Sequence, residues 1–111
     1  MITSTLAQEV SQLEANLCSG LADPTRILIL YALSECPHTV TELSNALGLS
    51  QPTTSRHLKI LRERGLVYAE RQGINVLYHL GDERLIQALD LLRGVLRDTV
   101  TKRASLMEEI P

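Results

Sequence analysis

The stretch from Thr39 to Gly65 constrains the fold most, because two short helical patterns meet there across a brief turn. Thr39 and Glu42 have the spacing of a capping box, which marks the start of a helix. Gly48 can adopt the left-handed conformation that ends such a helix. Ser50 can then cap a second helix, which Gly65 ends. The pattern predicts a helix-turn-helix.

Two further helices are expected before this motif. The first has a single apolar stripe at spacings of four, three and four, formed by Leu6, Val10, Leu13 and Leu17. The second can start at Asp23 and Pro24, since Asp is a good N-cap and Pro is tolerated in the first helical turn. Its sequence is apolar nearly all round, so we expect a central buried helix that ends before Pro37.

Beyond Gly65 the hydrophobic period changes from helical to extended. Leu66–Arg71 and Val76–Leu80 are rich in Val, Leu and Tyr, and Gln72-Gly73-Ile74-Asn75 separates them. This predicts a β-hairpin, which would form a wing next to the second helix of the motif. Asp82 can cap a last helix, whose apolar stripe comprises Leu85, Leu89, Leu92, Val95 or Leu96, and Val100.

These elements make one winged helix-turn-helix domain over residues 1–111, mostly α (α+β), with about five helices and one hairpin. The chain has no Phe or Trp, and an aliphatic core suits helix packing better than a β-sandwich. The helices at about 4–18 and 82–105 carry apolar stripes longer than a small domain needs. We therefore expect a homodimer that forms through these two helices.

Composition limits the cellular setting. The net charge is −2, so any basic surface for a polyanion must be local. Cys18 and Cys36 form no CxxC, which argues against a zinc ribbon or a disulfide-dense secreted scaffold. The first residues do not resemble a signal peptide, and the longest apolar run, Ile27 to Leu33, is far shorter than a bilayer span. A cytoplasmic protein without a membrane partner is expected.

Three segments resemble the ArsR/SmtB family of bacterial transcriptional repressors: GLADPTRILIL from Gly20, LGLSQPTTSRHLKILRERGLV from Leu47 and ERQGINVLYHL from Glu70. The similarity covers roughly Leu17 to Leu80. It implies a homodimeric winged helix-turn-helix that binds operator DNA near its own promoter. It also implies release from that DNA by a metal, metalloid, oxidant or sulfur species.

The second helix of the motif and the wing carry the candidate DNA contacts. Thr54, Leu58 and Leu61 fall on one face and should turn inward. Gln and Arg on the other faces can read base edges, while Ser, Thr and Lys mostly hold phosphates. The resemblance implies that Gln51, Ser55 and Arg56 face DNA. The full candidate set is Ser50, Gln51, Thr53, Ser55, Arg56, His57, Lys59, Arg71, Gln72 and Asn75.

The alternative is that these charges only solvate a surface helix, as most charge runs do. The attached turn and wing favour DNA binding, because together they have the docking geometry of a groove reader.

The best-known effector sites of the family are missing. Thr39, Val40 and Thr41 stand where its arsenic sensors have Cys-Val-Cys, and hydroxyls are poor ligands for a soft metalloid. The positions that match its zinc ligands hold Asp82, Arg84, Val95 and Asp98, and neither Arg nor Val coordinates zinc. Tyr31 takes the place of the first cysteine of its persulfide sensors.

Cys18, Cys36 and His38 remain as candidate metal or redox residues. A helix from Pro24 to Glu35 would span about 18 Å, too far for a disulfide within one chain. Some members of the family gather thiolates from the N-terminal helix of one subunit and the end of the second helix of the other. By that resemblance, these residues could hold a thiophilic metal or metalloid ion between subunits. The alternative is that Cys18 is a small buried hydrophobe and Cys36 a half-exposed bystander.

Two functions stay open. The first is an operator-binding repressor released by a metal, metalloid or thiol-reactive signal, which would change the angle between the two recognition helices. The second is a winged-helix module for DNA binding or protein assembly with no small-molecule or metal inducer. An enzyme is disfavoured, because the sequence offers no nucleophile with a plausible base, no paired carboxylates in a predicted pocket and no Gly-rich phosphate loop.

Overall fold

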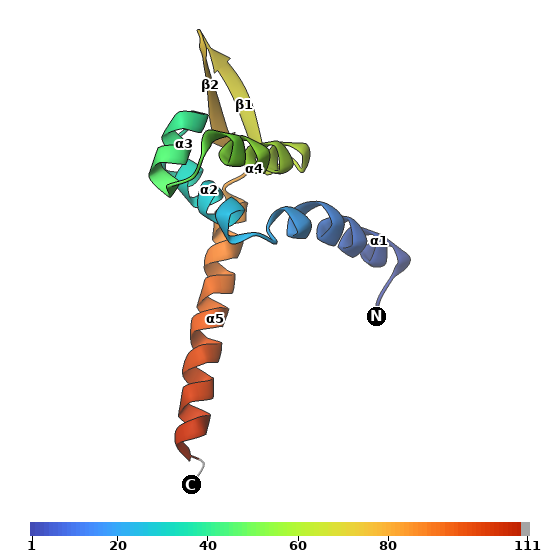
Figure 1. The fold of residues 1–111 in the computed structure, drawn as a ribbon. Helices are drawn as coiled ribbons and strands as arrows, with labels where there is room; N and C mark the ends of the chain where they lie inside the picture. The colour runs from blue at the N-terminus through green and yellow to red at the C-terminus, as the bar shows by residue number, and fades with distance from the viewer. Residues whose placement is uncertain (110–111) are drawn as a thin grey trace.

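The computed structural model describes residues 1–109. Its elements, in chain order, are α1 (Ser4–Gln12), the π-helical segment η1 (Leu13–Cys18), α2 (Pro24–Glu35), α3 (Val40–Leu47), α4 (Gln51–Glu63), β1 (Val67–Gln72), β2 (Asn75–Leu80) and α5 (Arg84–Glu109). The helices α2, α3 and α4 gather beside the hairpin, whereas α1 and α5 extend away in different directions (Figure 1). The predicted winged helix-turn-helix is confirmed. The predicted end of the domain, residue 111, lies outside the described residues.

The helix-turn-helix forms from the local interactions that its sequence predicts. The capping box of α3 is complete, because Thr39 N donates to Glu42 Oε1 at 2.8 Å and Glu42 N donates to Thr39 Oγ1 at 3.2 Å. Gly48 follows α3 with φ +67°, the left-handed conformation. Ser50 Oγ accepts a hydrogen bond from Thr53 N at 3.2 Å and so caps α4. Both helices of the motif therefore begin where predicted.

The core is aliphatic and lies where α2, α3, α4, β1 and the first turns of α5 meet. Its buried members are Ile29, Leu30, Leu33, Leu43, Leu58, Leu61, Leu66, Val67 and Leu89. The predicted inward face of α4 is confirmed, since Thr54 is buried with Leu58 and Leu61. The expected central helix, α2, buries Ile29, Leu30 and Leu33, but one side of it is open, because Leu28 is 54% exposed. Leu28 lies on the side of α2 that faces away from the core cluster.

The wing is a two-stranded antiparallel hairpin. Its register runs from Val67 opposite Leu80 to Gln72 opposite Asn75. The turn is therefore Gly73-Ile74 alone, shorter than the four-residue connection expected, because Gln72 and Asn75 pair as strand residues. Gly73 has φ +65°, which a tight turn requires and which glycine adopts without steric cost.

The terminal helices differ from the expected ranges. The N-terminal helix does not continue regularly over residues 4–18, because its last six residues are wound as a π-helix. The last helix begins at Arg84 and reaches Glu109, beyond the expected end near residue 105. Asp82 precedes it and accepts a hydrogen bond from Arg84 N at 2.8 Å, as a cap would.

The chain is extended for its size. Its radius of gyration is 17.6 Å, whereas a compact chain of this length has about 13 Å. The outer parts of α1 and α5 account for this, because their apolar side chains are not packed against the core: Val10 is 52% exposed and Leu96 63%. The start of α5 does reach the core through Leu89. Within residues 1–109 we find no helix with the length and apolarity needed to cross a membrane.

Candidate nucleic-acid interface

The outer face of α4 carries most of the candidate DNA contacts. Burial of Thr54, Leu58 and Leu61 fixes the rotation of the helix about its own axis. This rotation leaves Gln51, Ser55, Arg56 and Lys59 exposed to solvent. Two residues that could read base edges, Gln51 and Arg56, therefore share the outer surface with two that could hold phosphates.

Ser50 and Thr53 are engaged with each other at the start of α4. Ser50 Oγ donates to Thr53 Oγ1 at 2.9 Å and accepts from Thr53 N. Their hydroxyls therefore stabilise the first turn of the helix that carries the exposed face.

Gln51, the first residue of α4, is tied to α3. Its Nε2 donates a hydrogen bond to Thr41 Oγ1 at 3.1 Å. Thr41 is an exposed residue of α3, and the sequence assigned it no part in DNA binding. The contact crosses the turn of the motif, so the spacing of residues along either helix could not have indicated it.

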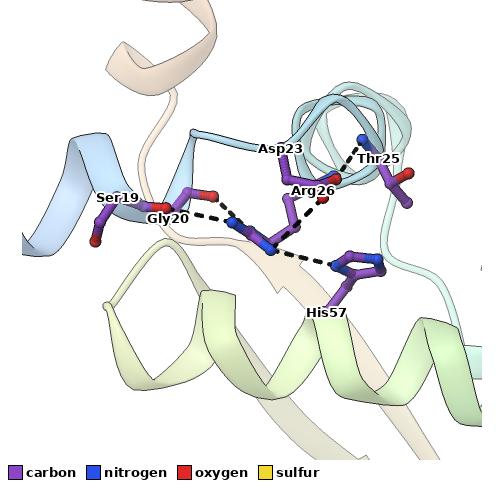
Figure 2. A network of polar contacts seen from close by, with 6 residues as sticks. All are labelled: Ser19, Gly20, Asp23, Thr25, Arg26 and His57. Carbon is purple, nitrogen blue, oxygen red and sulfur yellow. Dashed lines mark hydrogen bonds and ion pairs between the residues drawn. The ribbon is translucent and has the colours of Figure 1, made fainter.

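His57 is half-buried and turned toward the body of the protein. Its Nδ1 lies 3.4 Å from Nη1 of Arg26, a residue of α2 (Figure 2). A guanidinium only donates hydrogen bonds, so Nδ1 must be the accepting nitrogen in this contact. His57, a candidate DNA contact, therefore lies behind the exposed residues of α4 and faces α2 instead.

Arg26 is the polar residue that the sequence analysis missed. Its Nε donates to the carbonyl oxygen of Gly20 at 2.7 Å, and its Nη2 donates to that of Ser19 at 3.3 Å. Figure 2 shows the guanidinium between these carbonyls and the ring of His57. The side chain is 12% exposed, and a buried charge of this kind needs such partners. The sequence feature that could have indicated it is its position in GLADPTRILIL, the first of the three segments that resemble the family.

Asp23 completes this network as the N-cap of α2. Its Oδ1 accepts from Thr25 N at 2.8 Å and Arg26 N at 3.3 Å. Burial would raise the pKa of this carboxyl, but the backbone N–H groups of Arg26 and Thr25, together with the charge of Arg26, outweigh it and hold the pKa below its ordinary value. Asp23 is therefore a charged cap that also faces the guanidinium of Arg26.

The wing places Arg71, Gln72 and Asn75 at its exposed tip. His79 lies further down the wing and stacks on Tyr68, with the ring centroids 4.7 Å apart. The tip is therefore solvent-facing and carries three polar side chains around the exposed Ile74, whereas His79 belongs to the packing of the hairpin.

The candidate metal or redox residues are separated into a pair and a single thiol. Sγ of Cys36 lies 3.5 Å from Nε2 of His38. Cys18 lies at the end of η1 and is exposed in the single chain. In the described part of the chain, no three His, Cys, Asp or Glu side chains form a group that could hold a metal ion. One chain thus supplies two neighbouring donors, short of the four that a closed zinc site uses.

The Cys36–His38 pair adjoins the wing. The backbone of His38 forms an isolated bridge with Tyr78 of β2, with N···O distances of 3.1 and 2.8 Å. Cys36 is therefore only two residues from His38, whose backbone is hydrogen-bonded directly to the hairpin.

Comparison with known proteins gives consistent results. Residues 23–69 match the family described as bacterial regulatory protein, arsR family. The HTH-type transcriptional repressor SmtB of Mycobacterium tuberculosis is 44% identical over 78 residues, which are 70% of this chain and 58% of that protein. The chain thus spans less than two thirds of the length of SmtB. The HTH-type transcriptional regulator NmtR of the same organism is 40% identical over 84 residues, 76% of this chain and 69% of NmtR.

A solved structure shares the fold. The homodimeric winged helix-turn-helix DNA-binding domain of a Mycobacterium bovis protein superposes with a TM-score of 0.76 and 26% identity. The superposition covers 89% of this chain and 91% of that one.

Proposed function

The chain belongs to the arsR family of bacterial regulatory proteins, and on that premise we propose that it is a homodimeric transcriptional repressor that binds operator DNA. The observation that carries the proposal is the orientation of α4. Its buried side chains turn Gln51, Ser55 and Arg56 outward, and the wing carries three further exposed polar residues toward its tip. A recognition helix presented in this way can enter the major groove of DNA. Chromosomal DNA as the partner implies a cytoplasmic location.

Local charge supports this proposal despite the net charge of −2. Exposed cations gather on α4 and the wing tip: Arg56, Lys59, Arg62 and Arg71. Cations of this kind neutralise phosphates and release counterions, so the affinity should fall as salt increases.

The proposed dimer forms through α1 and α5. Their apolar side chains beyond the core are exposed, including Val10 of α1 and Leu92 and Leu96 of α5, and burial of such surface is the main driving force of association. A second copy would also supply a second α4, which two successive major grooves require. The homodimeric M. bovis domain supports this assembly for a chain of the same fold.

We further propose an inorganic or redox signal that acts at Cys36 and His38. A thiol and an imidazole nitrogen 3.5 Å apart suit a thiophilic metal or metalloid ion. Among the described residues of one chain these two donors lie together, and Cys18 of the second copy would add a third. The bridge between His38 and Tyr78 would pass a change at the pair to the wing.

The second candidate function is a winged-helix module with no small-molecule or metal inducer. It is favoured by the distribution of the candidate metal ligands, because Cys18, Cys36 and His38 of one chain do not form a group that could hold a metal ion. Such a protein would bind DNA, or another protein, without release by a signal.

The deciding experiment begins with a DNA duplex that the protein selects from a randomised pool. Release from this duplex is then assayed against As(III), Zn(II), Cd(II), peroxide and persulfide, with ion binding to the free protein titrated in parallel. Under the first proposal, one of these agents releases the protein, and Cys36→Ser abolishes both the release and the binding. If none of them releases it, or if the Cys18→Ser, Cys36→Ser double variant responds as the wild type does, the thiol signal is refuted.

A further inference from the structure

Thr41 and Gln51 form a hydrogen bond between the two helices of the motif. Gln51 Nε2 donates to Thr41 Oγ1 at 3.1 Å, although ten residues separate the two positions. Both side chains are exposed, so no packing requirement holds them together. Gln51 is the first residue of α4, and the N-terminal residues of a recognition helix are the ones that contact base edges.

The hydrogen bond to Thr41 leaves Gln51 with one free N–H donor and one carbonyl acceptor, which are the two groups that pair with adenine. A primary amide has two N–H donors and one carbonyl acceptor, and Thr41 uses one of the donors. The remaining N–H can donate to adenine N7, and Oε1 can accept from the N6 amino group. This bidentate pairing distinguishes adenine from the other bases in the major groove.

Holding Gln51 in advance lowers the cost of binding. A free glutamine side chain loses a large part of its rotamer freedom when it is fixed against a base. A side chain already held by Thr41 has lost part of that freedom before DNA arrives, so less is lost on binding.

We propose that Thr41 is a positioning residue, which presents Gln51 to the adenine of an A·T base pair in the operator. This inference rests on the proposed function, because it requires sequence-specific DNA binding. It assigns Thr41 a part in DNA recognition at a position where the arsenic-binding residues of the family are replaced by hydroxyls.

The test uses the duplex selected by the wild-type protein, together with every single base-pair change in it. Thr41→Val keeps the branched shape but removes the hydroxyl, whereas Thr41→Ser keeps the hydroxyl and is the matched control. We expect Thr41→Val to reduce discrimination at one A·T position by about two- to tenfold, as for the loss of one hydrogen bond. Thr41→Ser should retain the discrimination of the wild type, and binding to a scrambled duplex should be the same for all three proteins.

A double-mutant cycle assigns the effect to Gln51. Gln51→Ala should abolish discrimination at the same base pair, and Thr41→Val should have no further effect there in that background. The inference is overturned if Thr41→Val leaves discrimination intact, if it weakens binding equally to all sequences, or if its effect persists without Gln51. If the wild type selects no sequence at all, the proposed function fails, and the inference fails with it.

Discussion

Nη1 of Arg26 lies 3.4 Å from Nδ1 of His57, and this contact joins α2 to α4. The same guanidinium binds the carbonyl oxygens of Ser19 and Gly20 just beyond η1 (Figure 2). One side chain therefore connects the N-terminal helical segment with the central helix and with the helix that carries the candidate DNA contacts. The position of α4 depends on this connection as well as on the core.

Replacing Arg26 should destabilise the fold. Arg26→Ala removes the donors for the Ser19 and Gly20 carbonyls and the partner of His57, so the free energy of unfolding should fall by about 1–3 kcal/mol. Urea unfolding measures this change. Arg71→Ala, at the exposed tip of the wing, is the control and should change stability by less than about 0.5 kcal/mol. An Arg26→Ala protein as stable as the wild type would show that the network adds nothing.

Arg56 and Lys59 should affect DNA binding differently. If Arg56 reads a guanine, Arg56→Ala should weaken binding to the selected duplex by about 1–3 kcal/mol and relax specificity at one base pair. Lys59→Ala should weaken binding to all sequences and reduce the salt dependence of the affinity by about one unit of slope. Titrations at several salt concentrations distinguish the two results. Unchanged affinity in either variant would remove that residue from the interface.

The ion pair of Asp82 and Arg84 predicts an acid-dependent loss of stability. The side chain of Arg84, helped by its backbone N–H, lowers the pKa of Asp82 from 3.8 to about 2. Since the folded pKa is the lower one, this stabilisation is present above pH 3.8 and is lost as the pH falls toward 2.

Asp82→Asn should therefore lose less stability than the wild type between pH 4 and about 2, because asparagine can still cap α5 but does not titrate. Arg84→Gln should show a smaller reduction, since it removes the guanidinium but keeps the backbone N–H that also binds the carboxylate. Unfolding free energies measured at each pH give the comparison. Parallel profiles for the wild type and both variants would contradict this account of the pair.

The dimer should depend on the apolar face of α5. Leu92 is 61% exposed in the single chain, so Leu92→Arg should leave the fold intact but prevent association. Thr101→Arg is the control, because nine residues along a helix place it on the opposite side. Light scattering at micromolar concentration should give a dimer for the wild type and the control, and a monomer for Leu92→Arg. A monomeric wild type would refute the dimer.

The sequence predicted most successfully the features that arise between near neighbours. The capping box of Thr39 and Glu42 and the left-handed Gly48 depend on residues within a few positions of each other, and both were found. The wing was also expected, but Gln72 and Asn75 were assigned to its turn, because pattern alone does not give strand register.

The contacts around the candidate site could not be predicted from sequence pattern, because they join residues that are far apart in the chain. Arg26 and His57 are 31 residues apart, and Thr41 and Gln51 meet only after α3 and α4 have packed. The exposure of Cys18 likewise follows from the way η1 leaves the core, which its own sequence does not determine.

Sequence-specific DNA binding by the intact chain is the most direct test of the whole account. Fluorescence anisotropy at physiological salt would compare the selected duplex with a scrambled duplex of the same composition. A specific repressor should bind the selected duplex at least about a thousandfold more tightly. Equal affinity for the two duplexes, or no measurable binding to either, would contradict the proposal that α4 and the wing read operator DNA.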